Sequence, residues 1–199
     1  MLRTSRQRTL IVVITTALLL AALALGGAFV LHARATQMSA GDPLASVHAA
    51  TARYNDLNQA TANKYALFKD VNGIACIANT DDPSQGAMGI HYLNGDLVGA
   101  VASSGTFDPL KPQALVYEPG ANGKLHLVAL EFLVFQKGWE AKHGSGAAAP
   151  TLFGQTFMLI PAHNRFSPDA IYALHVWLWK DNPSGMFSMW NPTVHCPAA

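Results

Sequence analysis

Charged residues are scarce in this chain, at 13% of the total, and residues 36–199 contain no basic cluster. Four of the 13 Lys and Arg residues lie within residues 1–35, which leaves nine against all 12 Asp and Glu residues and a net charge of −3. A mildly acidic domain does not attract the phosphates of nucleic acids or the headgroups of anionic lipids. The composition therefore argues against nucleic acid as a partner.

The motifs of phosphate binding and covalent catalysis are also absent from the sequence. There is no glycine-rich phosphate-binding loop, no serine in the G-x-S-x-G context of a nucleophile elbow, and no internal repeat. No Cys–His arrangement resembles an activated nucleophile. A covalent enzyme mechanism therefore has no support in the sequence.

The first 35 residues have the features of an export signal. Arg3, Arg6 and Arg8 precede an uncharged run over residues 10–31, and the small-x-small motif Ala33-Arg34-Ala35 follows. This run exceeds the roughly 7–15 residues of an ordinary signal peptide and is long enough to span a bilayer. We expect residues 1–35 to be either a signal peptide cleaved after Ala35 or an uncleaved membrane anchor, with the rest of the chain on the outer side.

Residues 36–42 are then a linker, and residues 43–199 are long enough for one globular domain with its own core. Its two cysteines, Cys76 and Cys196, lie far apart in the sequence. In an oxidising compartment such a pair is most simply a disulfide. The alternative is a thiolate metal site that includes His195, although the spacing matches no zinc pattern.

The domain begins with a helical pattern and continues with strands. Asp42 and Pro43 are typical of a helix start, and the apolar spacing that follows predicts two short amphipathic helices, or one kinked helix, over residues 43–65. Asn94-Gly95 is typical of a hairpin turn. We expect an α+β fold in which N-terminal helices precede an antiparallel β-barrel or sandwich. The expected strands cover residues 88–94, 114–118, 124–135, 152–160 and 171–180.

Three of these strands carry an ionisable residue where the apolar alternation predicts a hydrophobic one. The residues are His91, Glu131 and His175, and burying such groups singly is costly. If they converge inside the fold, two imidazoles and a carboxylate form an open site for a divalent metal such as Zn, Fe, Mn or Cu. Glu118 is a candidate fourth ligand. The alternative is a structural polar pair between Glu131 and His175.

Aromatic residues gather around the turn at residues 181–185. Trp177 and Trp179 precede this turn and Trp190 follows it. Such residues form either an aromatic plug of the core or a platform for a ligand.

Several segments of the chain resemble a family of exported bacterial proteins of unknown function. They are MGIHYLN (residues 88–94), ALVYE (114–118), LFGQ (152–155), LHVWLWKDNPSGMF (174–187) and WNP (190–192), with the late Cys196. The resemblance implies export to the bacterial cell envelope and a single domain, but no activity. A looser architectural likeness connects the expected barrel to cupins, which hold a metal on histidines and a glutamate.

Three functions follow as hypotheses, and none of them indicates a protein partner. The first is a membrane-tethered binding module that holds a metal ion or small molecule on the His/Glu cluster. The second is a cupin-like metal-dependent enzyme, which a solvent-accessible mouth with a mobile loop at residues 138–151 would favour. The third is a structural envelope protein in which the cluster only stabilises the fold.

Overall fold

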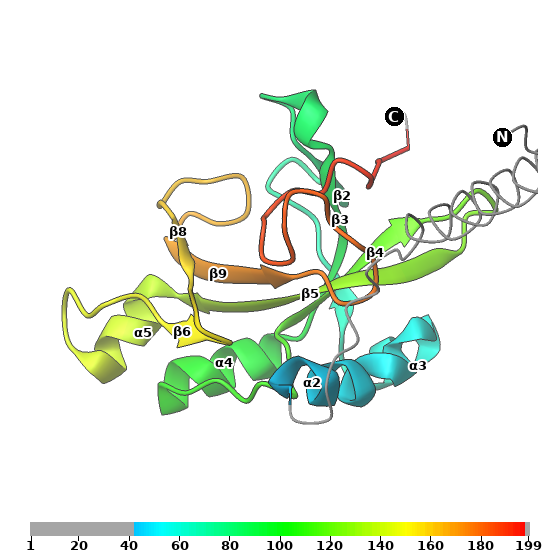
Figure 1. Ribbon diagram of the computed structural model, residues 1–199. Helices are drawn as coiled ribbons and strands as arrows, with labels where there is room; N and C mark the ends of the chain where they lie inside the picture. The colour runs from blue at the N-terminus through cyan, green and yellow to red at the C-terminus, as the bar shows by residue number, and fades with distance from the viewer. Residues whose placement is uncertain (1–41, 198–199) are drawn as a thin grey trace, which may run out of the picture. The chain divides into compact units, whose positions relative to one another are not determined.

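The computed structural model describes residues 42–197, which combine helices with antiparallel sheets and so confirm the α+β class (Figure 1). The expected export segment, residues 1–35, lies outside these residues. Within residues 42–197, no helix has the length and apolar character needed to cross a membrane. The helices are α2 (Pro43–Thr51), η1 (Ala52–Asn55), α3 (Leu57–Ala62), η2 (Pro83–Gln85), α4 (Gly95–Ser104) and α5 (Gln136–His143). The strands are β1 (Ala66–Leu67), β2 (Cys76–Ala78), β3 (Ala87–Leu93), β4 (Ala114–Pro119), β5 (Leu125–Phe135), β6 (Thr151–Leu152), β7 (Gln155–Thr156), β8 (Met158–Ile160) and β9 (Ile171–Val176).

The main sheet is open, so the expected barrel is wrong. Its order is β1-β3-β4-β5-β9-β8. Strand β2 also pairs with β3, along its first half, whereas β1 pairs with the end of β3. No pairing in the described part of the chain joins β8 to the opposite edge, and β6 and β7 form a separate two-stranded sheet. Alternation identifies the residues that share a face, but closure depends on which strands pair, and alternation carries no information on that.

Two segments expected to be a turn and a loop are helical, the second only in part. Asn94 is the N-cap of α4, where its side chain accepts a hydrogen bond from the Leu97 amide, so Asn94-Gly95 forms no hairpin turn. Helix α5 occupies residues 138–143 of the region expected to be a mobile loop, whereas residues 144–150 are loop. The strand expected over residues 152–160 is divided into β6, β7 and β8. The break between β6 and β7 falls at Phe153 and Gly154, which both have positive φ.

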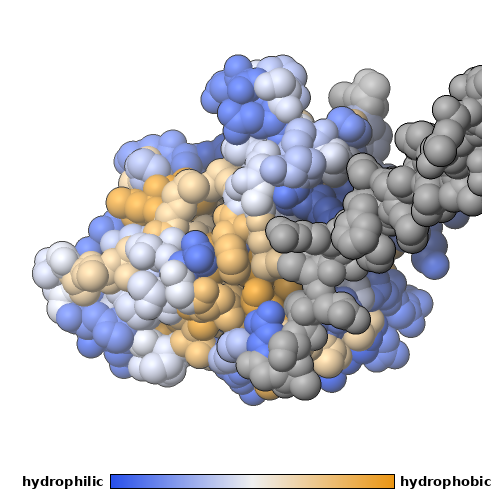
Figure 2. Space-filling view, viewed as in Figure 1, coloured by the Kyte–Doolittle hydropathy of each residue, from blue (hydrophilic) through white to orange (hydrophobic). Residues whose placement is uncertain are grey.

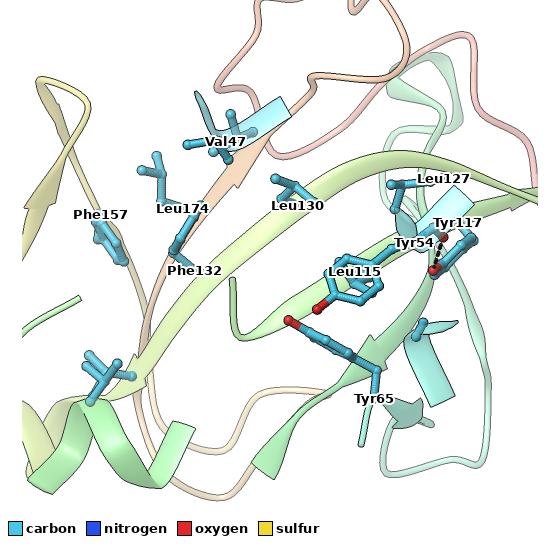
Figure 3. Packing of buried hydrophobic residues seen from close by; sticks show 14 of the residues in the cluster. Val47, Tyr54, Tyr65, Leu115, Tyr117, Leu127, Leu130, Phe132, Phe157 and Leu174 are labelled. Carbon is cyan, nitrogen blue, oxygen red and sulfur yellow. Dashed lines mark hydrogen bonds between the residues drawn. The ribbon is translucent and has the colours of Figure 1, made fainter. Parts of the chain in front are cut away.

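One face of the main sheet packs against the helices and forms the larger core (Figures 1 and 3). Alternate residues of β4, β5 and β9 meet residues of α2 and η1 there, among them Leu130, Phe132 and Val47. The Tyr117 hydroxyl donates to the Tyr54 carbonyl oxygen at 2.7 Å, which ties β4 to η1. The largest cluster of buried apolar residues lies on this face and forms most of the core. The opposite face of β5 is also covered.

The other face of the sheet is covered by irregular chain. The C-terminal segment pairs with β3 through a two-way backbone bridge between Ala87 and Asn191, and Val194 packs into an apolar cluster with Val116. The expected disulfide is present: Cys76 of β2 is bonded to Cys196, with a Cα–Cα distance of 5.6 Å. This bond fixes the covering segment to the sheet edge.

Strand β8 is an edge strand with partly exposed apolar side chains. Met158 and Leu159 are 52% and 45% exposed, and hydrophobic surface gathers in this region in Figure 2. Leu159 pairs with Tyr172 on the helix-covered face, whereas Ile160 pairs with Ile171 on the opposite face. Adjacent residues of β8 therefore project to different faces of the sheet.

Candidate metal centre

The three ionisable residues identified in the sequence meet on the loop-covered face of the sheet. Glu131 of β5 lies directly opposite His175 of β9. On its other side Glu131 lies opposite Ala114 of β4, and His91 comes from β3, one strand further. The cluster sits between two small apolar clusters, because Ala129 and Leu133 flank Glu131 on the same face of β5.

A small residue on β4 lets His91 and Glu131 meet across an intervening strand. Neighbouring strands lie about 4.8 Å apart, so β3 and β5 are separated by about twice that distance. Ala114 pairs with both Leu93 and Glu131, and its methyl side chain leaves room above β4. The long side chains of His91 and Glu131 reach each other over this position.

The nitrogen and oxygen atoms of the three side chains are in contact, but the distances between them are longer than those of good hydrogen bonds. Nε2 of His91 lies 3.4 Å from Nε2 of His175 and 3.6 Å from Oε2 of Glu131. Nδ1 of His175 lies 3.6 Å from Oε1 of Glu131. One ligand atom from each residue can be chosen so that all three lie within 4.8 Å of one another. Hydrogen bonds of this kind prefer about 2.7–3.2 Å, so the three groups only weakly satisfy one another.

Burial holds all three side chains in their neutral forms. It raises the pKa of Glu131 to about 8, because the buried carboxylate loses its hydration. It lowers the pKa of His91 to about 4, an effect that the nearby Gly89 backbone only partly offsets. Burial, and secondarily the repulsion that a protonated His91 would exert, lowers the pKa of His175 to about 3. At neutral pH the cluster therefore presents two neutral imidazoles and a largely protonated carboxyl group.

This donor set could hold a divalent metal ion. In a tetrahedral site with bonds of about 2.1 Å, ligand atoms lie about 3.4 Å apart, close to the His91–His175 and His91–Glu131 distances. The widest separation in the set, 4.8 Å, has to shorten by about 1.4 Å to reach this value. A bound cation would also favour the ionised carboxylate, which burial alone disfavours.

Glu118 does not join this cluster, so its assignment as a fourth ligand is corrected. It pairs with His126 of β5, which is five residues from Glu131 and hence about 17 Å along the strand. Its carboxylate forms an ion pair with Lys180 at 2.9 Å. A carboxylate at the end of a strand is more simply satisfied by a cation at the same edge of the sheet.

The tryptophans do not form a shared ligand platform. Trp177 is buried on the loop-covered face, where its Nε1 donates to the Ser188 carbonyl oxygen. Trp179 packs against the larger core and stacks on His48, with ring centroids 3.8 Å apart. Trp190 follows in the C-terminal segment, and its carbonyl oxygen accepts from Asn182. The plug interpretation fits Trp177 and Trp179, since they fill different clusters.

A second buried ion pair near the cluster was not identifiable from the sequence. The Asp70 side chain is fully buried and accepts hydrogen bonds from Nε and Nη2 of Arg165 at 3.1 and 2.8 Å. Nη1 of Arg165 also donates to the Ala78 carbonyl oxygen. Asp70 and Arg165 are 95 residues apart, and neither lies in a periodic segment that would indicate its burial.

Comparison of the chain with protein-family models, with curated proteins and with solved structures finds no match. The geometry of residues 42–197 is therefore the basis for assigning a function.

Proposed function

We propose that this protein is an exported binding module that holds one divalent metal ion on His91, Glu131 and His175. The observation that carries the proposal is the convergence of three buried ionisable side chains from three strands, with ligand atoms within 4.8 Å. Burying each group alone costs several kcal/mol, so their grouping calls for a shared partner.

The distances favour a shared cation over a purely structural polar pair. A structural Glu131–His175 pair would be expected at about 2.7–3.2 Å, whereas the closest approach is 3.6 Å. The spacing leaves room for an ion between the groups, as two imidazoles and one carboxylate provide in zinc and non-haem iron sites.

A metal-dependent enzyme is a second candidate, and one observation favours it. A partly open pocket adjoins His91 and Glu131, so a substrate could reach a metal held there. Three protein ligands leave coordination positions free, which metal-ion catalysis requires. The residues over this pocket include Phe166 and Pro168, which lie outside the region expected to be a mobile loop.

Export and membrane tethering form the second part of the proposal. The sequence of residues 1–35 supports export, and the Cys76–Cys196 disulfide is typical of an oxidising compartment outside the cytoplasm. The resemblance to exported bacterial proteins adds to the same expectation.

If residues 10–31 remain as an anchor, the mature protein should sediment with membranes and resist extraction with alkaline carbonate. Fractionation followed by N-terminal sequencing measures this. A soluble form that begins at Thr36 would show cleavage and rule out the tether, while leaving export intact.

The metal proposal predicts one equivalent of tightly bound Zn²⁺ or Co²⁺ in the purified full-length chain. Elemental analysis gives the stoichiometry, and Co²⁺ absorption reports the coordination geometry. We expect Glu131→Gln, which keeps the size of the side chain, and His175→Ala each to weaken Co²⁺ binding by at least about 100-fold, because each removes a ligand.

The matched control is His126→Ala, which removes an exposed histidine from the same strand as Glu131. It should leave Co²⁺ binding unchanged. Circular dichroism verifies that each variant is folded. If the folded Glu131→Gln chain binds Co²⁺ as well as the control does, or if the unmodified chain binds no metal, the polar-pair alternative is correct instead.

A further inference from the structure

A partly open pocket of about 150 Å³ adjoins the metal-ligand cluster on the loop-covered face. His91 and Glu131 form part of its wall. Other side chains come from β3, β4, β5, β8, β9, the loop at residues 161–170 and Phe68, which follows β1. An apolar cavity of about this volume is large enough to hold a benzene molecule. The pocket therefore has room for about one six-membered ring.

The wall of the pocket is mainly apolar. Ten of its thirteen residues are apolar, including Leu133, Phe135 and Ile171, so a charged or sugar-like molecule would lose its hydration there without gaining enough polar partners. A compact apolar molecule would instead gain the free energy of leaving water.

Two of the three polar residues of the wall, His91 and Glu131, are neighbours, with Nε2 and Oε2 3.6 Å apart. Besides His91 and Glu131, only Ser167 is polar, and its Oγ already accepts a hydrogen bond from the Asp169 amide at 3.0 Å. The 3.6 Å between Nε2 of His91 and Oε2 of Glu131 is longer than a preferred hydrogen bond, so neither group fully satisfies the other. A polar atom of a ligand is therefore expected beside these two residues.

We propose that this pocket binds a small, mainly apolar molecule, about one aromatic ring in size, whose single hydroxyl or carbonyl oxygen lies beside His91 and Glu131. The inference rests on the proposed function, because it names the class of ligand that the metal-binding cluster receives. An oxygen of this kind can coordinate a bound metal, and it can also form a hydrogen bond with Glu131 or His91.

The loop that forms one side of the pocket is held in place before any ligand binds. Arg165 is fixed to Asp70 by two hydrogen bonds, and its carbonyl oxygen accepts from the Val71 amide at 3.0 Å. Phe166 and Ser167, the next residues, line the pocket. A preformed site avoids the entropic cost of ordering a loop on binding.

The test uses two probes, 4-fluorophenol and 4-fluorotoluene, which carry a hydroxyl group and a methyl group at the same position of the ring. Each is titrated into the full-length zinc-loaded chain in the same detergent, and binding is followed by ¹⁹F NMR. We expect 4-fluorophenol to bind with a Kd on the order of 0.1–1 mM. We expect 4-fluorotoluene to bind at least about five-fold more weakly, because it leaves His91 and Glu131 without a partner.

Two substitutions on adjacent residues of β8 locate the site. Ile160→Trp places a large ring at the partly exposed wall of the pocket and should weaken 4-fluorophenol binding at least about ten-fold. Leu159→Trp adds the same ring on the opposite face and should leave the affinity unchanged. Equal affinities of the two folded variants, or no measurable binding by the unmodified chain, would overturn the pocket assignment.

The remaining outcomes separate this inference from the proposed function. Equal affinity for the two probes would overturn the role assigned to the oxygen. Zinc binding is measured in the absence of both probes. Zinc binding without 4-fluorophenol binding contradicts the pocket inference alone. Binding of 4-fluorophenol without zinc binding supports the pocket and contradicts the metal.

Discussion

Lowering the pH from 6.5 to 4 should reduce the free energy of unfolding of the metal-free protein by on the order of 3 kcal/mol. The cause is the burial of His91 and His175, whose pKa values fall from 6.5 to about 4 and about 3 in the folded protein. In this range the unfolded chain binds protons on both histidines that the folded protein does not. Glu131 partly offsets the effect, since the folded state keeps its proton above pH 4.5 while the unfolded chain releases it.

Raising the pH from 6.5 to 8 should also destabilise the metal-free protein, by about 1 kcal/mol, because the loss at Glu131 exceeds the gain as the histidines of the unfolded chain lose their remaining protons. The pKa of Glu131 is raised from 4.5 to about 8 in the folded protein, so the unfolded chain binds fewer protons throughout this window. The metal-free protein is therefore expected to be most stable near pH 6.5. Urea unfolding of the full-length chain in EDTA, repeated between pH 4 and 8.5, measures both limbs of the profile.

Substitutions separate the contributions to this profile. Glu131→Gln should remove the fall in stability between pH 6.5 and 8, because the amide does not titrate. Replacing both His91 and His175 by Gln should remove most of the fall below pH 6.5. His126→Ala, at an exposed position, should preserve both limbs. A stability that stays constant from pH 6.5 to 8 in the unmodified, metal-free chain would contradict the burial of an ionisable Glu131.

The second large effect is expected on removal of the disulfide. Cys76 and Cys196 are 120 residues apart, and closing a loop of this length stabilises a fold by about 5 kcal/mol on the chain-entropy model. The double substitution Cys76→Ala and Cys196→Ala should therefore lower the free energy of unfolding by up to that amount. Urea unfolding with and without dithiothreitol measures the loss.

Dithiothreitol should have no effect on the double variant, which serves as the control. The disulfide also bears on the metal centre, because Cys196 packs against the apolar cluster that contains Trp177 and Ala129. Loosening this cover should expose one side of His175 and Glu131 to water. A loss below about 1 kcal/mol on reduction would show that the covering segment is held mainly by its other contacts.

The sequence identifies the site residues because burial leaves a local pattern. Successive side chains of the eleven-residue strand β5 point to opposite faces of the sheet, and both faces are mainly apolar. The carboxylate of Glu131 is therefore conspicuous in β5, as is the imidazole of His175 in β9. Recognising that Glu131 and His175 are buried requires only the two-residue period of a strand. Their convergence is confirmed, although the period alone could not show that Glu131 lies opposite His175 while His91 reaches over Ala114.

The incorrect predictions have a different physical origin. Asparagine favours both hairpin turns and helix N-caps, and at Asn94 the burial of Val98 and Val101 against the sheet favours the helix. The place of Glu118 depends on the ladder between β4 and β5, which contains a register shift after Val116. The structure at Asn94 and the position of Glu118 depend on contacts between segments that are distant in the sequence. A local sequence pattern does not contain information on these contacts.

The long separation of Cys76 and Cys196 also imposes an order on biosynthesis. If the chain is exported from its N-terminal end, Cys76 reaches the oxidising compartment well before Cys196 and remains a reactive thiol during that interval. Until the C-terminal segment follows, the face that carries the His–Glu cluster stays open to solvent, so a metal ion can enter without any opening of the finished fold. Oxidation is then a late event, and it fixes the C-terminal segment over one side of the proposed metal site.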